Sequence, residues 1–226
     1  MIVRAIASNQ THDWLMRVHY AHRLPSISYA FGLFDGAELC GIVTYGTPSS
    51  APLRSGICGD EYSPHVLELN RLCIASTQKN AASILVGRSL TLLPRPSVVV
   101  SYADTEAGHV GYVYQACNFI YTGLSAKRTD WKIRGMEHLH GQTVADMSRD
   151  ECEDGQSRAD YMRAKYGDDF YLLDRPRKHR YVYMVGSKRQ KRDMMAALKY
   201  PQEPYPKGES MRYEITTTAT TQMVLL

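Results

Sequence analysis

The stretch from residue 101 to residue 123 reads SYADTEAGHVGYVYQACNFIYTG, and it decides the predicted fold class. Three valines at 98–100 lead into it and predict a buried strand, so its first polar residues, Asp104 among them, should stand where the strand ends. Two glycines then loosen the chain before a short helix that carries Tyr114, and a return strand is expected from Phe119 to Leu124. We therefore expect Asp104 and Tyr114 to face one cleft.

The elements on either side of this stretch predict an α/β protein. Apolar residues at helical spacing predict a helix from His12 to Arg23, and Asp35-Gly36 predicts a tight turn between strands at 28–34 and 38–45. The other expected elements are a loop from Thr47 to Tyr62, a strand from His65 to Ile74, a helix from Ala81 to Leu93 capped by Asn80, a helix from Ser157 to Tyr166, a strand from Arg180 to Val185 and a helix from Lys188 to Leu198.

The chain has 226 residues, of which 44% are hydrophobic, enough for one domain with a sizeable core and some appendages. We expect a single domain over residues 1–200 that carries an insertion at about 137–174. Residues 201–226 contain prolines and a threonine-rich run without periodicity, so an extended or mobile tail is expected. The sequence contains no internal repeat.

Five cysteines, an odd number with no Cys-x-x-Cys pair, argue against a disulfide scaffold and against a structural zinc site. The amino-terminal residues MIVRAIASNQTHDWL lack an apolar core like that of a signal peptide. No window approaches the roughly 20 apolar residues of a membrane span. A soluble, cytoplasmic protein with reduced thiols and no membrane partner is expected.

Charge is segregated in the second half of the chain. Residues 137–174 hold ten acidic and four basic residues, whereas residues 175–212 hold eleven basic and three acidic ones. A cationic block interleaved with tyrosines attracts a nucleic-acid backbone, and a plain solvated surface is the alternative. The basic residues expected to hold DNA are Arg175, Arg177, Lys178, Arg180, Lys188, Arg189, Lys191 and Arg192.

Two groups of side chains in the first half suggest chemistry. His19 and His22 are three residues apart with Tyr20 between them, so on one helix they share a metal or a proton, or are ordinary helical histidines. Asp104 lies where α/β sheets bind ligands, although a helix cap explains it equally well.

Arg71 alternates with apolar residues in its strand and needs an anionic partner, either a substrate group or a neighbouring carboxylate. Gln78, Asn80 and Ser83 open the next helix, where backbone N–H groups attract an anion. The motifs of serine hydrolases, P-loop nucleotide-binding proteins and zinc metalloproteases do not occur in the sequence.

The strand order, the long hairpin, the strand-to-helix cradle after Ile74 and the run GYVYQACNF after Asp104 together resemble the GNAT acyltransferase superfamily. That superfamily usually receives a coenzyme A pyrophosphate on a glycine-rich cradle, whereas the run at 78–83 here is QKNAAS. Side chains in place of glycines narrow the approach to the backbone, which favours a specialised branch.

Within that superfamily, the sequence resembles the phage Mom family of DNA modification proteins over roughly Asp13 to Tyr183. The resemblance is carried by His19-Tyr20, the run LNRLCI around Arg71, Ser83, and Asp104 followed ten residues later by Tyr114. Members of that family convert the N6 amino group of adenine in phage DNA to a carbamoylmethyl, glycinamide-like form that blocks host restriction enzymes. The resemblance therefore implies a transferase that acts on double-stranded DNA.

The resemblance also implies catalytic roles for His19, Tyr20, Asp104 and Tyr114. Asp104 would accept or orient an N6 proton, while Tyr114 would stabilise the donor or act as an acid. His19 and Tyr20 would complete the floor of the cleft, and together with Asp104 they are candidate ligands for iron. The candidate substrate-binding or cofactor-binding residues are Arg71, Gln78, Asn80, Ser83 and Ser101.

The N–CH₂ bond of such a product is not an amide, so plain acyl transfer is not the whole mechanism. The donor stays open, with an acyl-CoA-like compound as one candidate. Because adenine N6 is hard to reach inside a duplex, the base is expected to flip out and stack on tyrosines. A homodimer is compatible with the sequence.

Two other functions also fit the sequence. The first is a GNAT N-acetyltransferase that uses acyl-CoA on a small amine or a protein, which requires only the fold and the donor. The second is a DNA-binding protein without catalysis, which requires only the basic block.

Overall fold

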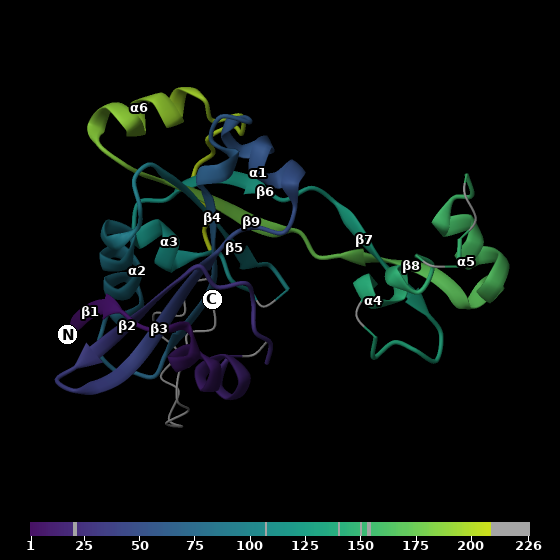
Figure 1. The fold of residues 1–226 in the computed structure, drawn as a ribbon, viewed down its shortest axis with the longest axis horizontal. Helices are drawn as coiled ribbons and strands as arrows, with labels where there is room; N and C mark the ends of the chain where they lie inside the picture. The colour runs from purple at the N-terminus through teal and green to yellow at the C-terminus, as the bar shows by residue number, and fades with distance from the viewer. Residues whose placement is uncertain (20–21, 107, 140, 150, 153–154, 209–226) are drawn as a thin grey trace. The chain divides into compact units, whose positions relative to one another are not determined.

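The computed structural model describes residues 1–19, 22–106, 108–139, 141–149, 151–152 and 155–208 (Figure 1). Contacts divide the chain into two compact units, one formed by residues 1–124 with the described residues from Lys178 onward, and one by Ser125–Arg177. The second unit extends beyond the acidic stretch at 137–174 on both sides. The part of the expected tail from residue 209 onward lies outside the described residues.

A seven-stranded sheet, in the order β1-β2-β3-β4-β5-β9-β6, forms the centre of the first unit. Only the pairing of β4 with β5 is parallel, so the sheet is mixed, as expected for an α/β protein. The strands are β1 (Ile2–Ala5), β2 (Tyr29–Asp35), β3 (Glu38–Gly46), β4 (Val66–Ile74), β5 (Ser97–Asp104), β6 (Ile120–Leu124) and β9 (Lys178–Val185).

The predicted hairpin is confirmed as β2 and β3, which pair from Tyr29–Tyr45 to Asp35–Glu38. Its turn contains Gly36 with a φ of 59°, a conformation that glycine adopts without steric cost. At the other end of β3, a Cβ on Gly46 would lie 1.9 Å from the Ser26 carbonyl oxygen. The chain therefore needs glycine there to pass its own backbone.

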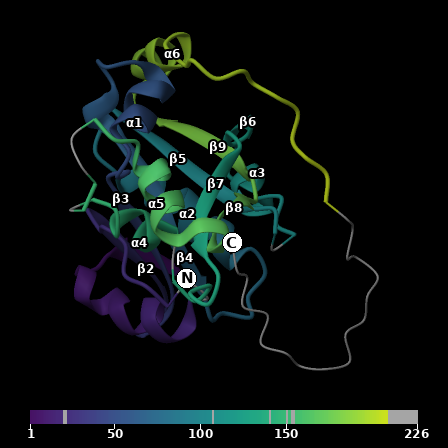
Figure 2. The same ribbon diagram turned by 90° about the vertical axis from the view of Figure 1, so that its right-hand side faces the viewer.

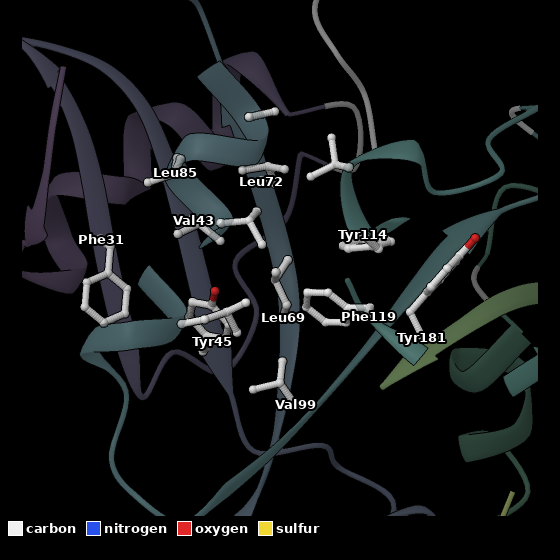
Figure 3. Close-up of a cluster of buried hydrophobic side chains, with 14 of the residues drawn as sticks. Phe31, Val43, Tyr45, Leu69, Leu72, Leu85, Val99, Tyr114, Phe119 and Tyr181 are labelled. Carbon is white, nitrogen blue, oxygen red and sulfur yellow. The ribbon is translucent and has the colours of Figure 1, made fainter. Parts of the chain in front are cut away.

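Helices cover both faces of this sheet (Figures 1 and 2). Successive apolar side chains of β5 point to opposite faces, so each face needs a cover. Val99 belongs to the core under α2 (Ala81–Leu92) and α3 (Tyr112–Ala116), part of which Figure 3 shows. Val98 and Val100 point the other way, into the core formed with Ile57 and Met194. Those two residues belong to α1 (Ala51–Cys58) and α6 (Lys188–Ala196), which lie side by side.

The helix predicted from His12 to Arg23 is present only as far as Val18, and the prediction is wrong from His19 onward among the described residues. The chain forms a 3₁₀ turn at Ser8–Thr11 and a short π-helix at Trp14–Val18, where the N–H of His19 donates to the carbonyl of Trp14 at 2.9 Å. His19 itself is extended, with a φ of −74° and a ψ of 132°. This extended residue ends the helical run before it reaches His22.

The stretch Thr47–Tyr62, predicted as a loop, contains α1, and a 3₁₀ turn follows at Ser63–His65. The Ser50 hydroxyl accepts a hydrogen bond from the Leu53 N–H at 3.3 Å. A proline lies in the first turn of the helix, where a backbone N–H has no partner within the helix and its loss therefore costs nothing. The serine and proline residues that indicated a loop therefore begin a helix here.

The second unit has its own sheet of β7 (Arg128–Ile133) and β8 (Phe170–Arg175), which the sequence reading did not predict. α4 (Gly141–Asp146), α5 (Arg158–Tyr166) and a 3₁₀ turn at Gly167–Asp169 accompany it. Ile133, Val144, Met162 and Phe170 form its core. The unit is inserted between β6 and β9, which pair with each other and include the partners Leu124 and His179.

After α6, residues 199–208 run along the first unit and are tied to it by backbone contacts. The Lys199 N–H donates to the carbonyl of Ile57 at 2.8 Å, and the Glu203 N–H donates to that of Tyr121 at 2.9 Å. The Tyr205 hydroxyl donates to the carbonyl of Phe119 at 2.6 Å. No helix among the described residues is long and apolar enough to cross a membrane.

Candidate active site

The parallel strands β4 and β5 separate in the middle of the sheet, and a pocket opens there. They pair from Val66–Val98 to Glu68–Val100, after which β4 continues along β3 and β5 continues along β9. Ligands of α/β sheets bind where neighbouring strands diverge in this way. The pocket has a volume of about 90 Å³ and is lined by His19, Glu68, Leu69, Asn70, Arg71, Leu72, Tyr102, Tyr114 and Lys178.

Tyr114 reaches the pocket from α3 and is held by other aromatic rings. Its ring centroid lies 5.2 Å from that of Tyr181 and 5.4 Å from that of Phe119. Figure 3 shows the three rings next to one another. Gly111, with a φ of 76°, precedes the helix, and a Cβ there would lie 2.6 Å from the Tyr181 ring. The predicted glycine-to-helix arrangement therefore fixes the position of Tyr114 through close packing.

Asp104 ends β5, as predicted, and forms an ion pair with Lys178 at 2.8 Å. Burial alone would raise the pKa of Asp104, but the hydrogen bond and charge of Lys178 outweigh it and hold the pKa below its usual range. Lys178 lines the pocket, whereas Asp104 is not among the lining residues. Asp104 is thus an ionised carboxylate that holds a lysine at the pocket.

His19 is almost fully buried at the pocket, with 3% of its surface exposed. Burial, the charge of Arg71 and the proximity of His22 lower its pKa to about 4, so the imidazole is neutral near pH 7. His22 does not share a helix face with it, because the helical run ends at His19. Nδ1 of His22 donates to the Met16 carbonyl at 2.9 Å. Tyr20 lies outside the described residues.

Ser101 and Arg71 take different places in the site. The Ser101 hydroxyl is fully buried and donates to the Leu69 carbonyl at 3.0 Å, so it joins the two separating strands instead of lining the pocket. Arg71 lines the pocket, and its Nη1 donates to the Asn70 carbonyl at 2.6 Å. Arg71 and Lys178 together make this pocket cationic.

The iron site considered from the sequence has the ligands His19, Tyr20 and Asp104, of which Tyr20 lies outside the described residues. Arg71 and Lys178 bring two positive charges to the pocket, which oppose a bound cation, while Glu68 brings one carboxyl group, and the Asp104 carboxylate is already paired. Within the ranges that the structure describes, no three His, Cys, Asp or Glu side chains gather closely enough to hold a metal ion.

The three cradle residues line a second pocket of about 280 Å³ between the end of β4, the start of α2 and α3. The side chain of Asn80 does not cap α2, contrary to the prediction, because the left-handed backbone of Asn80, with a φ of 65°, does not allow this. Instead its carbonyl accepts the Ser83 hydroxyl at 3.0 Å. Gln78 donates to the Asp35 carboxylate at 3.0 Å.

The basic residues expected to hold DNA fall into two groups. Those from 175 to 180 have partners inside the protein: Arg175 with Asp130, Arg177 with the Ser125 carbonyl, Lys178 with Asp104, and Arg180 with Thr122. Those of α6 are exposed: Lys188, Arg189, Lys191 and Arg192. A capping box of Ser187 and Gln190 starts this helix, and Met194 anchors it in the core. The α6 residues are therefore the ones available to a phosphate backbone.

Glu68 and Tyr102 line the first pocket but were not among the predicted site residues. Lys178 was assigned to DNA binding but also lines it. The only signal for Glu68 in the sequence was the alternation of polar and apolar residues along β4. This alternation does not show where β5 separates from β4. The pocket depends on this separation.

Fold and pockets define an α/β protein with a cationic pocket where two parallel strands part, and a second pocket at a helix start. The chain belongs to the Mom protein family, whose family model matches residues 1–207. The resemblance to that family noted in the sequence is thereby confirmed.

Among known proteins, methylcarbamoylase mom of Escherichia phage Mu is 29% identical to this chain over 205 residues, covering 86% of this chain and 80% of that protein. Two solved structures are similar at low identity. An N-acetyltransferase from Staphylococcus aureus Mu50 has a TM-score of 0.42 and 11% identity, covering 81% of this chain and 98% of its own. A Bacillus subtilis acetyltransferase in complex with CoA has a TM-score of 0.37 and 12% identity, covering 80% and 86%.

Proposed function

We propose that this protein transfers a carbamoylmethyl group to the N6 amino group of adenine in double-stranded DNA and so protects phage DNA from host restriction enzymes. One observation carries the proposal. His19, Arg71 and Tyr114, which the family resemblance marks as functional, come from three distant segments and line one pocket. Family membership and the name of the phage Mu relative support the same activity.

The proposed transfer requires specific groups in this pocket. Adenine N6 is a weak nucleophile because its lone pair is delocalised into the ring, so the enzyme must align it with an electrophilic carbon and remove a proton. Tyr114 stands at the pocket to stabilise the donor or to act as an acid. Asp104 acts here through Lys178, whose ammonium group it holds at the pocket.

The second pocket is the proposed place for the donor. It opens at the start of α2, a twelve-residue helix whose first N–H groups favour an anionic group. An acyl-CoA-like compound has such groups. The N–CH₂ bond of the product requires a further step beyond acyl transfer.

DNA is held, in this proposal, by the exposed cations of α6, and the target adenine leaves the duplex to reach the pocket. Extrusion exposes N6 to the transfer group and costs a few kcal/mol of stacking and pairing. Flexible cationic side chains on a helix surface suit contacts to phosphates, which position the duplex without reading its sequence.

Nucleoside mass spectrometry tests the proposal. DNA from bacterial cells that express the wild-type protein should contain carbamoylmethyl adenosine. Tyr114→Phe should lower its fraction at least about tenfold, consistent with the loss of an acid or donor contact. Tyr29→Phe, which removes a hydroxyl from a partly exposed tyrosine of β2, should leave that fraction unchanged. A wild-type sample without any carbamoylmethyl-modified nucleoside would reject the function.

A further inference from the structure

Glu68 stands at the point where the two parallel strands separate. It pairs with Val100 in the last step of the parallel ladder, and its side chain lines the pocket that opens beyond that step. Tyr114 and Lys178 line the same pocket from α3 and from β9. The carboxyl group of Glu68 therefore lies among the groups that the proposed transfer uses.

The two carboxyl groups near the pocket differ in what they contact. Asp104 is engaged twice, by the Lys178 ammonium at 2.8 Å and by the Glu106 N–H at 3.1 Å. Among the residues that the structure describes, the Glu68 carboxyl forms no hydrogen bond or ion pair. A carboxylate that takes up a proton during a reaction needs free lone pairs. Neither carboxylate oxygen of Glu68 is engaged by another described residue, whereas in Asp104 one oxygen accepts from Lys178 and the other accepts from the Glu106 N–H.

The surroundings tune Glu68 toward a basic role. Burial raises the pKa of its carboxyl group, and the charges of Arg71 and Lys178 oppose this rise in part. A carboxylate with a raised pKa is a stronger base than one with the ordinary value. The other titratable side chains that line the pocket are His19, Tyr102 and Tyr114.

We propose that Glu68 is the catalytic base of the transfer, taking the proton from adenine N6 as the new bond forms. This inference rests on the proposed function. The donor is a compound whose carbamoylmethyl group is attached to a leaving group. The bond from N6 to the methylene carbon of that group forms, the bond from this carbon to the leaving group breaks, and the leaving group keeps the electron pair. The N6 proton passes to a carboxylate oxygen of Glu68 and from there to water.

The test compares purified wild-type protein with Glu68→Gln and Glu68→Asp. Each protein receives plasmid DNA and a lysate of bacteria that lack the gene, which supplies the donor, at several values between about pH 5 and pH 9. Nucleoside mass spectrometry gives the initial rate of adenine modification. Dividing each variant's rate by the wild-type rate at the same pH cancels any effect of pH on the donor supply.

A catalytic base predicts a rate ratio for Glu68→Gln that depends on pH. At low pH, where the wild-type carboxyl is protonated, the two rates converge; above its pKa the wild type is faster by about 10²-fold to 10⁴-fold. Glu68→Asp keeps a carboxylate and should retain the rise of rate with pH at a lower level. Asp104→Asn, which weakens the hold on Lys178, should slow the reaction by a similar factor at every pH.

A Glu68→Gln ratio that is constant over the whole pH range would assign Glu68 a structural role and overturn the inference. Such a result would leave the proposed function standing, because the wild-type protein would still modify adenine. Absence of modified adenine with the wild-type protein would overturn both. Thermal melting followed by circular dichroism verifies that each variant is folded, and Glu68→Asp carries the test if Glu68→Gln does not fold.

Discussion

The cations of α6 give the sharpest test of the DNA contact. Asp193 lies 3.8 Å from Arg189 and 3.5 Å from Arg192, so these two arginines are partly neutralised. Lys188 and Lys191 form no ion pair with the described residues, and both are exposed. The Lys191 ammonium lies 5.3 Å from the centre of the Tyr183 ring, an exposed contact of small weight in stability. Replacing both lysines with glutamate should therefore remove two phosphate contacts without disturbing the fold.

The size of the effect follows from counterion release. Each lost phosphate contact lowers the slope of log affinity against log salt by about 0.9, so the double variant should lose about 1.8 from the wild-type slope. Extrapolated from high salt, this corresponds to a loss of affinity of about 200-fold at 50 mM salt and about 20-fold at 200 mM. Fluorescence anisotropy with a labelled DNA duplex over a salt series measures both quantities.

A matched variant separates this contact from the effect of net charge. Arg88→Glu with Arg95→Glu changes the charge by the same amount at exposed positions on and just after α2, which covers the opposite face of the sheet from α6. Its slope should stay close to the wild-type slope. Equal losses in the two double variants, or no loss in the α6 variant, would refute the assignment of α6 as the DNA contact.

Three further predictions concern stability, each measured by urea unfolding. Gly46→Ala should destabilise the fold by about 3 kcal/mol, because its Cβ would lie 1.9 Å from the Ser26 carbonyl oxygen; wild-type stability would contradict this close approach. Arg180→Lys should cost about 1–2 kcal/mol, because Arg180 donates to the hydroxyl and carbonyl of Thr122, both at 2.9 Å, and stacks on a tyrosine ring; a variant that loses DNA affinity but no stability would contradict this role. The pKa of His19 is lowered from 6.5 to about 4 in the folded state, so protonation of the unfolded chain begins first as the pH falls. The contribution of His19 to the free energy of unfolding is therefore complete above about pH 6.5 and is lost as the pH falls toward 4. In the wild type, up to about 3 kcal/mol of folding stability is lost through His19 as the pH falls from about 6.5 to 4, and His19→Gln should not show this loss. If stability depends on pH in the same way in both proteins, the imidazole of His19 is not buried in its neutral form.

Local signals in the sequence were sufficient for much of the first unit. The hairpin of β2 and β3 follows from strand-like runs around Asp35-Gly36, and α2 follows from helical spacing that ends near Pro94. The failure at His12–Arg23 has a nonlocal cause. The extended backbone of His19 ends the helical run, and the burial of its imidazole depends on contacts with distant segments.

The site was predictable residue by residue but not as an arrangement. The family resemblance marked His19, Arg71 and Tyr114, and these three do line one pocket. Glu68 was not marked, because its role depends on where β5 leaves β4, a property of strand pairing across the sheet. The partners of the basic residues from 175 to 180 are likewise set by the fold, so charge counts alone did not separate them from the exposed cations of α6.

The insertion of the second unit between two paired strands has a consequence for how this fold tolerates change. Leu124 and His179 are register partners, so the two ends of the inserted segment leave the sheet side by side. Lengthening, shortening or exchanging that segment alters a loop whose closure cost grows only with the logarithm of its length. Related chains can therefore carry very different appendages at this hairpin while the cleft between β4 and β5 keeps its geometry.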